Sequence, residues 1–377
     1  MRTMNVTKVS LHPVPEVRTD PQPVRGAHTD GSTRGWKNMR SSWLRRVLLT
    51  VAVGTSMVLA APGGALAQPT EADDQRPVGE LTSVERESDR TVIANVYSPS
   101  MDKVIPLRVR TPADTSEPRP TLYLLNGSGG GQGIATWEKQ TDVENFFSDK
   151  NVNVVTPLLG GYSYYTDWRN DDPALGRNMW TTFLTHELPP VIDTEFGTSG
   201  RNAIAGLSMS GTSVLGLATA APELYEAVGA YSGCAETSTP LGQSYVQAVV
   251  RVKGGDPENM WGPVGDPAWI ENDPYLQAEK LRGIDLYISS GSGLPGQYER
   301  LGSRSVNNDP IGLVGQVVVG GSIEAAVHHC TQRMAQRLEE LDIPAQIDLR
   351  PAGTHSWDYW EDDLRNSWPL LSQAVGL

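Results

Sequence analysis

Ser208 is the first residue whose surroundings suggest chemistry. It lies in Gly206-Leu207-Ser208-Met209-Ser210-Gly211, between a short apolar run and a stretch of small residues. A nucleophilic serine on a sharp strand-to-helix turn needs small neighbours, because the strained backbone crowds the adjacent chain. Gly206 meets that need, but Ser210 stands where the pattern G-x-S-x-G has its second glycine. The motif therefore predicts a nucleophile only together with a base and an acid.

A nucleophilic serine needs an imidazole that takes its proton. In enzymes with a G-x-S-x-G turn this histidine comes last along the chain, after a strand, and His355 follows a predicted strand at 345–350. His186 precedes the serine inside a predicted helix and is interpreted as a packing or surface residue. His328 and His329 are neighbours on a predicted helix, so they point about 100° apart, and no carboxylate pair completes a metal site. We predict His355 as the base and no metal.

The acid that would orient the histidine has several candidates between the serine and His355. They are Glu299, Asp309, Glu324, Glu339, Glu340, Asp342 and Asp348. Residue types and spacing leave this choice open. Glu324 leads because it opens a helical run beside Ile323, where a partly buried carboxylate fits, whereas Glu339 and Glu340 are typical of a solvated helix end.

The glycine-rich stretch Gly127–Gly133 follows a predicted strand and has two interpretations. A dinucleotide or phosphate loop fails on residue types, since Gln132 breaks the pattern G-x-G-x-x-G and no Walker lysine follows. An oxyanion loop offers backbone N–H groups to the tetrahedral intermediate of acyl transfer. The serine and histidine downstream favour the oxyanion loop over a dinucleotide-dependent reductase.

Strands and helices must position these residues, and they alternate along the chain. Short apolar and β-branched runs predict strands at 91–97, 103–109, 120–125, 152–157, 202–205, 227–232, 285–289 and 345–350. Helical patterns occupy 180–192, 210–221 and 322–341. This alternation predicts an α/β fold, doubly wound, with a mostly parallel sheet and helices on both faces. One catalytic domain is expected to fill 81–377.

Composition excludes several classes of protein. The 377 residues include 31 Lys or Arg and 44 Asp or Glu, which gives a net charge of −13. Such acidity repels phosphate backbones, so we expect no nucleic-acid partner. Charged residues at 20% and hydrophobic residues at 38% are typical of globular proteins. Two cysteines are too few for a disulfide framework or a four-thiolate zinc site.

The N-terminal region predicts export. Residues 39–67 begin with arginines, continue with an apolar run over 47–61, and end in Ala65-Leu66-Ala67. This is the three-part pattern of a secretory signal peptide cleaved near Ala67. A membrane span needs about 20 apolar residues, and Gly, Thr and Ser at 54–56 interrupt this run. Residues 1–38 are interpreted as a disordered extension, or as lying upstream of a true start at Met39, and 68–80 as a linker.

Four anchors in order make the chain resemble the antigen 85 family of mycolyltransferases and its corynebacterial relatives. The likeness extends from about 122 to 360. The anchors are Leu124–Gly127, Gly206–Gly211, Met260–Pro263 with Asp266–Trp269, and Gly353–Trp357, and Thr166–Trp168 and Asn272–Pro274 agree as well. Each anchor alone is a weak signal, so the ordered set carries the resemblance.

The resemblance implies an α/β-hydrolase fold and a role for individual residues. Ser208 matches the nucleophile of the family, His355 its general base and Glu324 its acid, which resolves the choice of acid. The oxyanion donors would be the backbone N–H groups of Ser128 and Met209.

The resemblance also implies contacts with a sugar. Ser356 and Trp357 match positions that line the sugar pocket of the family. The oxyanion loop of the family carries an aspartate and an arginine that touch trehalose, and Asn126 and Gly129 stand in their places here. This departure removes a charge-assisted contact with the sugar.

The implied reaction is acyl transfer that needs no cofactor. The serine would take a mycolyl chain from trehalose monomycolate and pass it to a second sugar hydroxyl, of trehalose monomycolate or of arabinogalactan. A secreted esterase or lipase would share the triad and use water as the acceptor, and a non-catalytic cell-wall-binding protein is a further alternative. The Trp-Gly-Pro and His-Ser-Trp anchors favour the transferase.

The two cysteines are expected to form a disulfide. A cysteine pair in an exported protein is usually bridged, and the corynebacterial relatives imply such a pair. Cys234 follows the predicted strand 227–232, and Cys330 lies on the predicted helix of Glu324.

Overall fold

In the part of the chain that the structure describes, nine strands form one sheet in the order β1-β2-β3-β5-β4-β6-β7-β8-β9. The computed structural model describes residues 77–377. The strands are β1 Glu80–Arg86, β2 Thr91–Ser98, β3 Lys103–Arg110, β4 Thr121–Leu125, β5 Asn153–Pro157, β6 Asn202–Leu207, β7 Ala227–Tyr231, β8 Asp285–Ser290 and β9 Gln346–Leu349. The pairs from β1 to β5 are antiparallel, and the pairs from β5 to β9 are parallel. The prediction of a mostly parallel sheet is confirmed.

The N-terminal edge of the sheet is where sequence and structure differ. The predicted N-terminal extension and signal peptide lie outside the described residues, as does the predicted linker up to residue 76. The last residue of that linker, Glu80, begins β1, and the Gly79 N–H donates to the Glu187 carbonyl (3.0 Å). Most residues of β1 are exposed. An edge strand with little burial lacks the apolar pattern that identifies a strand in sequence.

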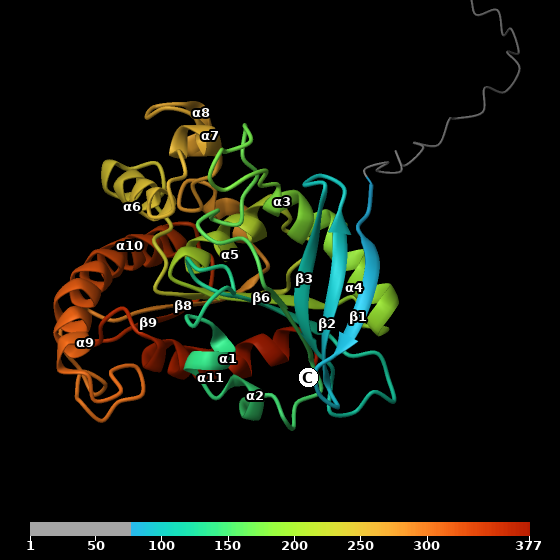
Figure 1. The fold of residues 1–377 in the computed structure, drawn as a ribbon. Coiled ribbons are helices and arrows are strands. Elements are labelled where there is room, and N and C mark those ends of the chain that lie inside the picture. Colours follow the sequence, from blue (N-terminus) through green and yellow to red (C-terminus); the bar gives the residue numbers. More distant parts are fainter. Residues whose placement is uncertain (1–76) are drawn as a thin grey trace, which may run out of the picture. The chain divides into compact units, whose positions relative to one another are not determined.

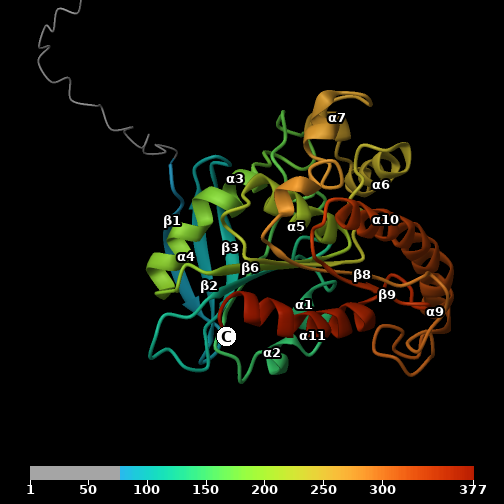
Figure 2. The ribbon, with the colours of Figure 1, turned by 180° about the vertical axis from the view of Figure 1, so that it is seen from behind.

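Helices cover both faces of the sheet (Figures 1 and 2). In Figure 1, α11 Trp357–Ala374, α1 Trp137–Gln140 and α2 Val143–Phe146 lie below it. The other helices are α3 Trp180–Thr182, the π-helical turn η1 Phe183–Glu187, α4 Leu188–Phe196, α5 Met209–Ala220, α6 Pro240–Arg251, α7 Pro257–Trp261, α8 Pro267–Glu271 and the 3₁₀ turn η2 Ala278–Leu281. The sheet is thus buried on both sides, as the apolar strands require.

Two apolar clusters fill the space between the sheet and its helices. Along β4, Leu122 and Leu124 belong to the cluster between the sheet and α11, whereas Tyr123 and Leu125 belong to the cluster on the opposite face of the sheet. Successive side chains of a strand point to opposite faces, so a strand that is apolar throughout packs on both. This arrangement fixes the ends of β4 and β6, from which the glycine-rich loop 127–133 and the serine turn emerge.

The predicted helix 322–341 is part of a longer one, a continuous helix over Pro310–Glu340. It consists of α9 Pro310–Gly315, a π-helical turn η3 Gln316–Gly320, and α10 Gly321–Glu340. Glycine is the weakest helix former after proline. Because glycines recur from 312 to 321, the first part of this helix was not predicted from the sequence. In the described part of the chain, it is the one helix long and apolar enough to cross a membrane by length and composition.

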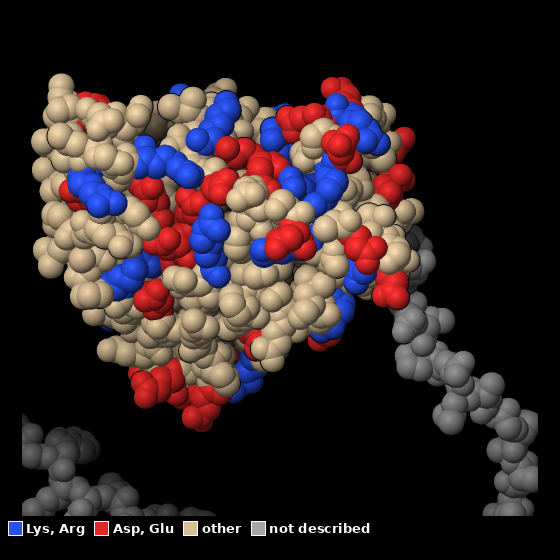
Figure 3. Space-filling view, turned by 90° about the horizontal axis from the view of Figure 1, so that it is seen from below, with Lys and Arg blue, Asp and Glu red and all other residues tan. Residues whose placement is uncertain are grey.

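The face seen from below carries acidic and basic side chains that are interspersed rather than segregated (Figure 3). On this side, Glu361 of α11 pairs with Arg304 (3.1 Å) and with Arg365 (2.7 Å). Exposed pairs of this kind contribute about 0–1 kcal/mol each. The interspersed charges on this face are therefore a solvated surface rather than a binding patch of one sign.

Candidate active site

Ser208 lies on the turn between β6 and α5 in a strained backbone conformation. Its φ is 55° and its ψ is −122°, a combination that a residue with a side chain rarely adopts. The turn is held by a hydrogen bond from the Ser208 N–H to the Tyr231 carbonyl of β7 (2.8 Å). Such strain persists only where the surrounding structure enforces it, and it marks functional turns.

The small neighbours of Ser208 allow this sharp turn. A Cβ on Gly206 would lie 2.6 Å from the Ser210 hydroxyl, and one on Gly211 would lie 2.6 Å from the Tyr231 carbonyl. The Ser210 hydroxyl accepts from the Leu207 N–H (2.9 Å). The departure from G-x-S-x-G is thereby explained, because Ser210 closes the turn with its side chain and Gly211 provides the close approach to β7.

His355 lies in the loop before α11 and contacts the serine directly. Its Nε2 is 2.8 Å from the Ser208 Oγ, and its Nδ1 is 2.7 Å from the Glu324 Oε2. Its backbone N–H donates to the Gly320 carbonyl (3.2 Å), and its ring meets Trp360 edge-on at 4.9 Å. Three residues separated along the chain therefore form one hydrogen-bonded series, in the geometry of a nucleophile, a base and an orienting acid.

The Glu324 carboxylate is fully buried and fully hydrogen-bonded. Besides His355, it accepts from the Ser232 hydroxyl (2.8 Å) and from the Gly291 N–H (2.6 Å). Ser232 in turn accepts from the Trp360 indole N–H (3.0 Å). Donors from several elements hold the acceptor atom in place, which matters because a buried charge without partners is strongly destabilising.

Cys234 and Cys330 form a disulfide. Cys330 lies on α10, less than two turns beyond Glu324, and Cys234 follows β7, which carries Tyr231 at its end. The covalent link thus ties the helix of the acid to the loop that flanks the serine turn.

The predicted oxyanion donors lie beside the serine. Ser128 and Met209 line the same cavity as Ser208 and His355. Met209 is the first residue of α5, so its N–H has no acceptor within the helix. The base of the loop 127–133 is pinned by Trp137, whose backbone N–H donates to the Asn126 Oδ1 (3.0 Å) and whose indole donates to the Leu125 carbonyl (2.9 Å).

The four residues predicted to contact a sugar occupy different environments. Asn126 is fully buried, and its Oδ1 is bonded to the Trp137 N–H of the loop. Its Nδ2 has no partner among the described residues, so only this amide nitrogen is available to a ligand. Gly129 is half-buried with ordinary space for a side chain. Ser356 is buried with its hydroxyl unpartnered in the described part of the chain, and Trp357 packs edge-on against Trp137 at 5.6 Å. The Trp357 ring is thus partly held in place.

An apolar cavity of about 340 Å³ opens at Ser208. Besides the catalytic candidates, its wall comes from α6 and α10, and it includes Tyr245, Ala248, Val249, Val252, Ile323 and Val327. Sequence reasoning missed these residues, and their spacing of three and four along each helix is the only signal that pointed to them. A nucleophile beside an apolar cavity suits the ester of an acyl chain.

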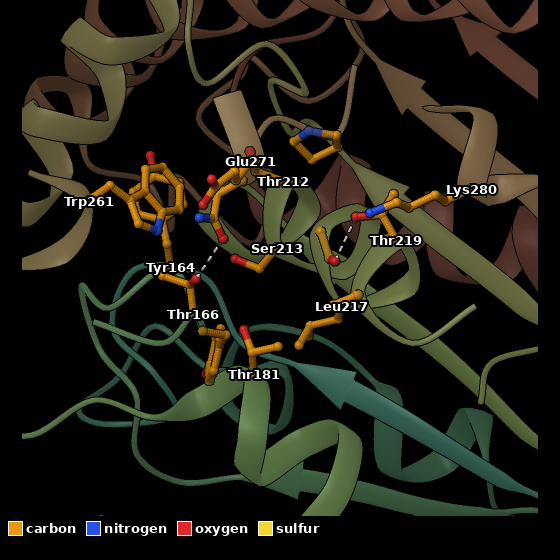
Figure 4. Close-up of a pocket in the computed structure, with 15 residues that line it drawn as sticks. Tyr164, Thr166, Thr181, Thr212, Ser213, Leu217, Thr219, Trp261, Glu271 and Lys280 are labelled. Atoms are coloured by element: carbon orange, nitrogen blue, oxygen red, sulfur yellow. Dashed lines mark hydrogen bonds between the residues drawn. The ribbon is translucent and has the colours of Figure 1, made fainter. Parts of the chain in front are cut away.

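Tyr164 separates this cavity from a smaller one. The smaller cavity, about 90 Å³, shares Tyr164 and Thr212 with the first, and Trp261 and Thr166 also line it (Figure 4). Tyr164 has a φ of 56°, and its ring lies 6.4 Å from that of Trp261. The Trp-Gly-Pro anchor and the Thr166 anchor thus support the strained tyrosine that forms part of the cavity wall.

Glu299, one of the acid candidates, holds the loop of His355 instead of contacting it. Its carboxylate accepts from the Thr354 hydroxyl (2.6 Å), the Gln316 amide (2.8 Å) and the Tyr359 hydroxyl (2.8 Å), and from the Gly296 N–H. Burial acts to raise the pKa of Glu299, but these hydrogen bonds outweigh it and lower the pKa. The carboxylate is therefore an anion that joins η3, α11 and the residue before His355.

The other three histidines among the described residues do not assemble a metal site. His328 lies 3.1 Å from the Ser290 hydroxyl, His329 is exposed, and His186 lies in η1. Within residues 77–377, no group of three or more His, Cys, Asp or Glu side chains is arranged to hold a metal ion.

Comparison with known proteins places this chain among esterases and acyltransferases. The Esterase family model matches residues 98–370. The diacylglycerol acyltransferase/mycolyltransferase Ag85A of Mycobacterium leprae (strain TN) is 31% identical over 291 residues, which cover 74% of this chain and 82% of that protein. Ag85B of the same strain is 30% identical over 266 residues, which cover 68% of this chain and 76% of that protein.

Solved structures share the fold. MPT51 (FbpC1) of Mycobacterium tuberculosis aligns with a TM-score of 0.60 at 23% identity, over 74% of this chain and 96% of that one. An S-formylglutathione hydrolase of Agrobacterium tumefaciens aligns with a TM-score of 0.57 at 16% identity, over 78% of this chain and 99% of that one. The predicted α/β-hydrolase fold is confirmed.

Proposed function

The chain belongs to the antigen 85 family of mycolyltransferases, and we propose on this basis that it transfers a mycolyl chain from trehalose monomycolate to a second sugar hydroxyl. The observation that carries the proposal is the hydrogen-bonded series Ser208–His355–Glu324, with distances of 2.8 and 2.7 Å, beside an apolar cavity. An enzyme of the acyltransferase and esterase type needs these two features together.

In the first half-reaction, His355 Nε2 takes the proton of the Ser208 hydroxyl as the Oγ attacks the ester carbon of the donor. The negative charge that develops on the carbonyl oxygen is stabilised by the N–H groups of Ser128 and Met209. When the intermediate collapses, the ester bond to trehalose breaks, and the departing sugar oxygen takes the proton from His355. The acyl chain is left on Ser208, with its alkyl part in the cavity.

In the second half-reaction, the hydroxyl of the acceptor sugar gives its proton to His355 and attacks the acyl carbon. The Ser208 Oγ leaves and recovers the proton from His355. Glu324 holds the imidazole in the required orientation and stabilises its charged form in both halves. Ser208 and His355 are the only two residues of the proposed site that have to gain or lose a proton.

The acceptor would lie outside the acyl cavity, next to the oxyanion loop and the start of α11. Ser356 and Trp357 remain the proposed sugar contacts there, with Gly129 across the loop. Trehalose monomycolate and arabinogalactan are both proposed acceptors, since each offers a primary sugar hydroxyl. Because Gly129 brings no charge, we expect recognition of the sugar to rest on hydrogen bonds and on the Trp357 ring.

The experiment that tests this function is a product analysis. The purified protein is incubated with trehalose monomycolate, with and without added glucose or trehalose, and the products are identified by mass spectrometry. We expect trehalose dimycolate, and mycolate on the added sugar. Release of free mycolic acid alone would contradict transfer and support the alternative function, a secreted esterase, which the uncharged Asn126 and Gly129 favour.

The control is the variant Ser208→Ala. Loss of the nucleophile in a serine triad lowers the rate by about 10⁶-fold, and the variant should form no covalent adduct with a serine-reactive fluorophosphonate. The matched control Ser210→Ala keeps the nucleophile and removes only the hydrogen bonds of the Ser210 hydroxyl to the Leu207 and Leu125 backbone, so it should still be labelled. Equal labelling of Ser208→Ala and the native protein would exclude Ser208 as the nucleophile, whereas absence of labelling in both would favour a non-catalytic cell-wall-binding protein.

Export remains part of the proposal. We propose that residues 39–67 direct secretion to the cell envelope and are removed near Ala67. N-terminal sequencing of the protein recovered from the medium of an expressing cell should begin at or near Gln68. A chain that stays in the cell with its N-terminus intact would contradict this proposal.

A further inference from the structure

The first part of the long helix Pro310–Glu340 presents apolar side chains to solvent. Ile311 is 84% exposed, Val314 62%, and Val318 and Val319 59% each. Spacings of three and four residues place the first three on one side of the helix, and Val319 adjoins Val318. No charged residue occurs between Asp309 and Glu324. The water-facing side of a surface helix normally carries charged and polar residues. In this segment that side carries apolar residues instead.

This apolar segment is continuous with the cavity at the serine. Ile323 and Val327, the next apolar residues on that helix, line the cavity. On the cavity wall contributed by the end of α6, Val252 is 65% exposed. In Figures 1 and 2, α6, α9 and α10 lie along the same lateral side of the sheet. One apolar surface therefore runs from the interior of the cavity, over its rim and onto α9.

The second part of the same helix is anchored in the domain. Cys330, Met334 and Leu338 are buried, and Cys330 is in the disulfide. Although the helix has the length and composition of a membrane span, its inner half packs on the sheet. Only the part of the helix before Glu324 is free to contact a non-aqueous phase. It would lie parallel to the boundary of that phase rather than cross it.

We propose that Ile311, Val314, Val318, Val319, Ile323 and Val252, termed here the α9 apolar surface, dock the enzyme on a lipid aggregate. The acyl chain of the donor would then pass from the lipid into the cavity without crossing water. This inference rests on the proposed acyl transfer, since a substrate that is soluble in water needs no such surface. It identifies the physical form of the substrate, a long-chain ester presented by a lipid phase.

The composition of the rim favours lipid over a second copy of the chain. Arg251 and Lys253 flank Val252, and both are exposed. Cations next to an inserted apolar residue extend their charged ends to the headgroup level. A stable protein interface buries about 800 Å² on each partner and involves about 20–30 residues. The α9 apolar surface consists of six aliphatic side chains, which is too few for a dimer and sufficient for insertion at a lipid surface.

The test compares two matched double variants. Ile311→Ser with Val314→Ser removes the two most exposed side chains of α9, and neither contacts the catalytic candidates. Val264→Ser with Ile270→Ser is the control, because these side chains are also exposed, at 67% and 53%, but lie in and beside α8. Each protein is used in the form that its expressing cell releases, with the N-terminus checked by mass spectrometry, so that all carry the same leading residues.

Binding is measured by flotation with phosphatidylcholine vesicles. We expect the native protein and the control to float with the vesicles, and the α9 variant to bind at least about tenfold more weakly, since each inserted aliphatic side chain contributes roughly a tenfold factor. Equal binding by both variants, or an equal loss in both, would overturn the proposal. A native protein that stays unbound and sediments as a dimer through this face would overturn it as well.

Activity separates this inference from the proposed function. All three proteins should cleave dissolved p-nitrophenyl butyrate at the same rate, and only the α9 variant should lose rate on a long-chain ester embedded in vesicles. Loss of butyrate cleavage in the α9 variant would indicate damage to the fold, and Val318→Ser would then replace it in the flotation test. If vesicle binding behaves as expected while trehalose monomycolate is not a substrate, the docking surface stands and the proposed transfer fails.

Discussion

Two fully buried carboxylates lie on opposite faces of the sheet and are stabilised in different ways. Glu324, on α10, accepts hydrogen bonds from Ser232, Gly291 and His355. Asp363, on α11, pairs with the partly buried guanidinium of Arg350. Burial raises the pKa of Asp363 to about 7, and Arg350 only partly opposes this effect.

The difference shows how the proposed catalytic carboxylate differs from a structural one. Glu324 is surrounded by donors that come from different elements, so its position is defined with respect to the histidine. Asp363 lies in an apolar layer with Arg350 as its one strong partner. Its negative charge is therefore energetically unfavourable at neutral pH, and it makes no contact with Ser208. Burial alone therefore does not identify a catalytic acid, whereas burial with convergent donors and an imidazole does.

The largest effect expected from this comparison is on catalysis through Glu324. Glu324→Gln keeps the shape of the side chain but offers the imidazole an amide, which favours the wrong tautomer of His355. Such a change in a serine triad lowers the rate by about 10⁴-fold. The measurement is kcat/KM on p-nitrophenyl butyrate. Glu339→Gln, at the exposed end of the same helix, is the control, and a Glu324→Gln enzyme of native activity would remove the acid role from this residue.

The second effect is on stability through Asp363. Because its pKa is raised in the folded state, the unfolded chain loses this proton first as the pH rises, and the free energy of unfolding falls between about pH 4 and pH 7. One pKa unit corresponds to about 1.4 kcal/mol, so the fall is at most about 4 kcal/mol. In Asp363→Asn the fall should be absent, although the variant is less stable overall because Arg350 loses its partner.

Urea unfolding at several pH values measures this difference. The control is Asp348→Asn, since Asp348 lies 3.7 Å from the same guanidinium but is partly exposed. The charge of Asp348 makes only the smallest contribution to the raised pKa of Asp363, so this variant should keep most of the fall. A pH dependence that survives in Asp363→Asn would show that both carboxylates are charged alike, and the contrast between the two faces would be lost.

The smallest effect concerns Glu299, which connects the loop of His355, through Thr354, to the helix of Asp363, through Tyr359. Glu299→Gln replaces an acceptor of four hydrogen bonds by a group that must also donate, so we expect kcat to fall by roughly tenfold with KM unchanged. Tyr359→Phe removes one of the four bonds and should have a smaller effect. A change in KM alone, or none in kcat, would show that Glu299 supports the fold without positioning His355.

Most of the architecture followed from local patterns. The eight predicted strands are all present. Most of them are apolar enough to indicate a buried strand, whereas β9 is short and only partly buried. The strand β1 was missed since it is exposed, and α9 was missed since its glycines disfavour a helix. The helix α11 was missed because its charged residues and Pro369 obscure a buried side that includes Trp360 and Asp363.

The site was predicted in part. Ser208 and His355 follow from motif and chain order, and they are 2.8 Å apart. The acid was open among seven carboxylates until the family resemblance selected Glu324. The sugar contacts remain predictions, and Asn126 illustrates the difficulty, because its letter in the sequence does not reveal that its side chain faces the loop backbone.

The amino-acid sequence by itself determined the fold class, the nucleophilic turn and the histidine, because these depend on residues close together along the chain. The residue pattern left the acid open and the family resemblance pointed to Glu324. Only the tertiary structure decided that Glu324 lies against the imidazole, that Glu299 supports the histidine loop, and that an apolar surface joins α9 to the cavity. These features require elements far apart in the sequence to converge. Convergence is decided by how helices pack on the sheet, which no local pattern of residues encodes.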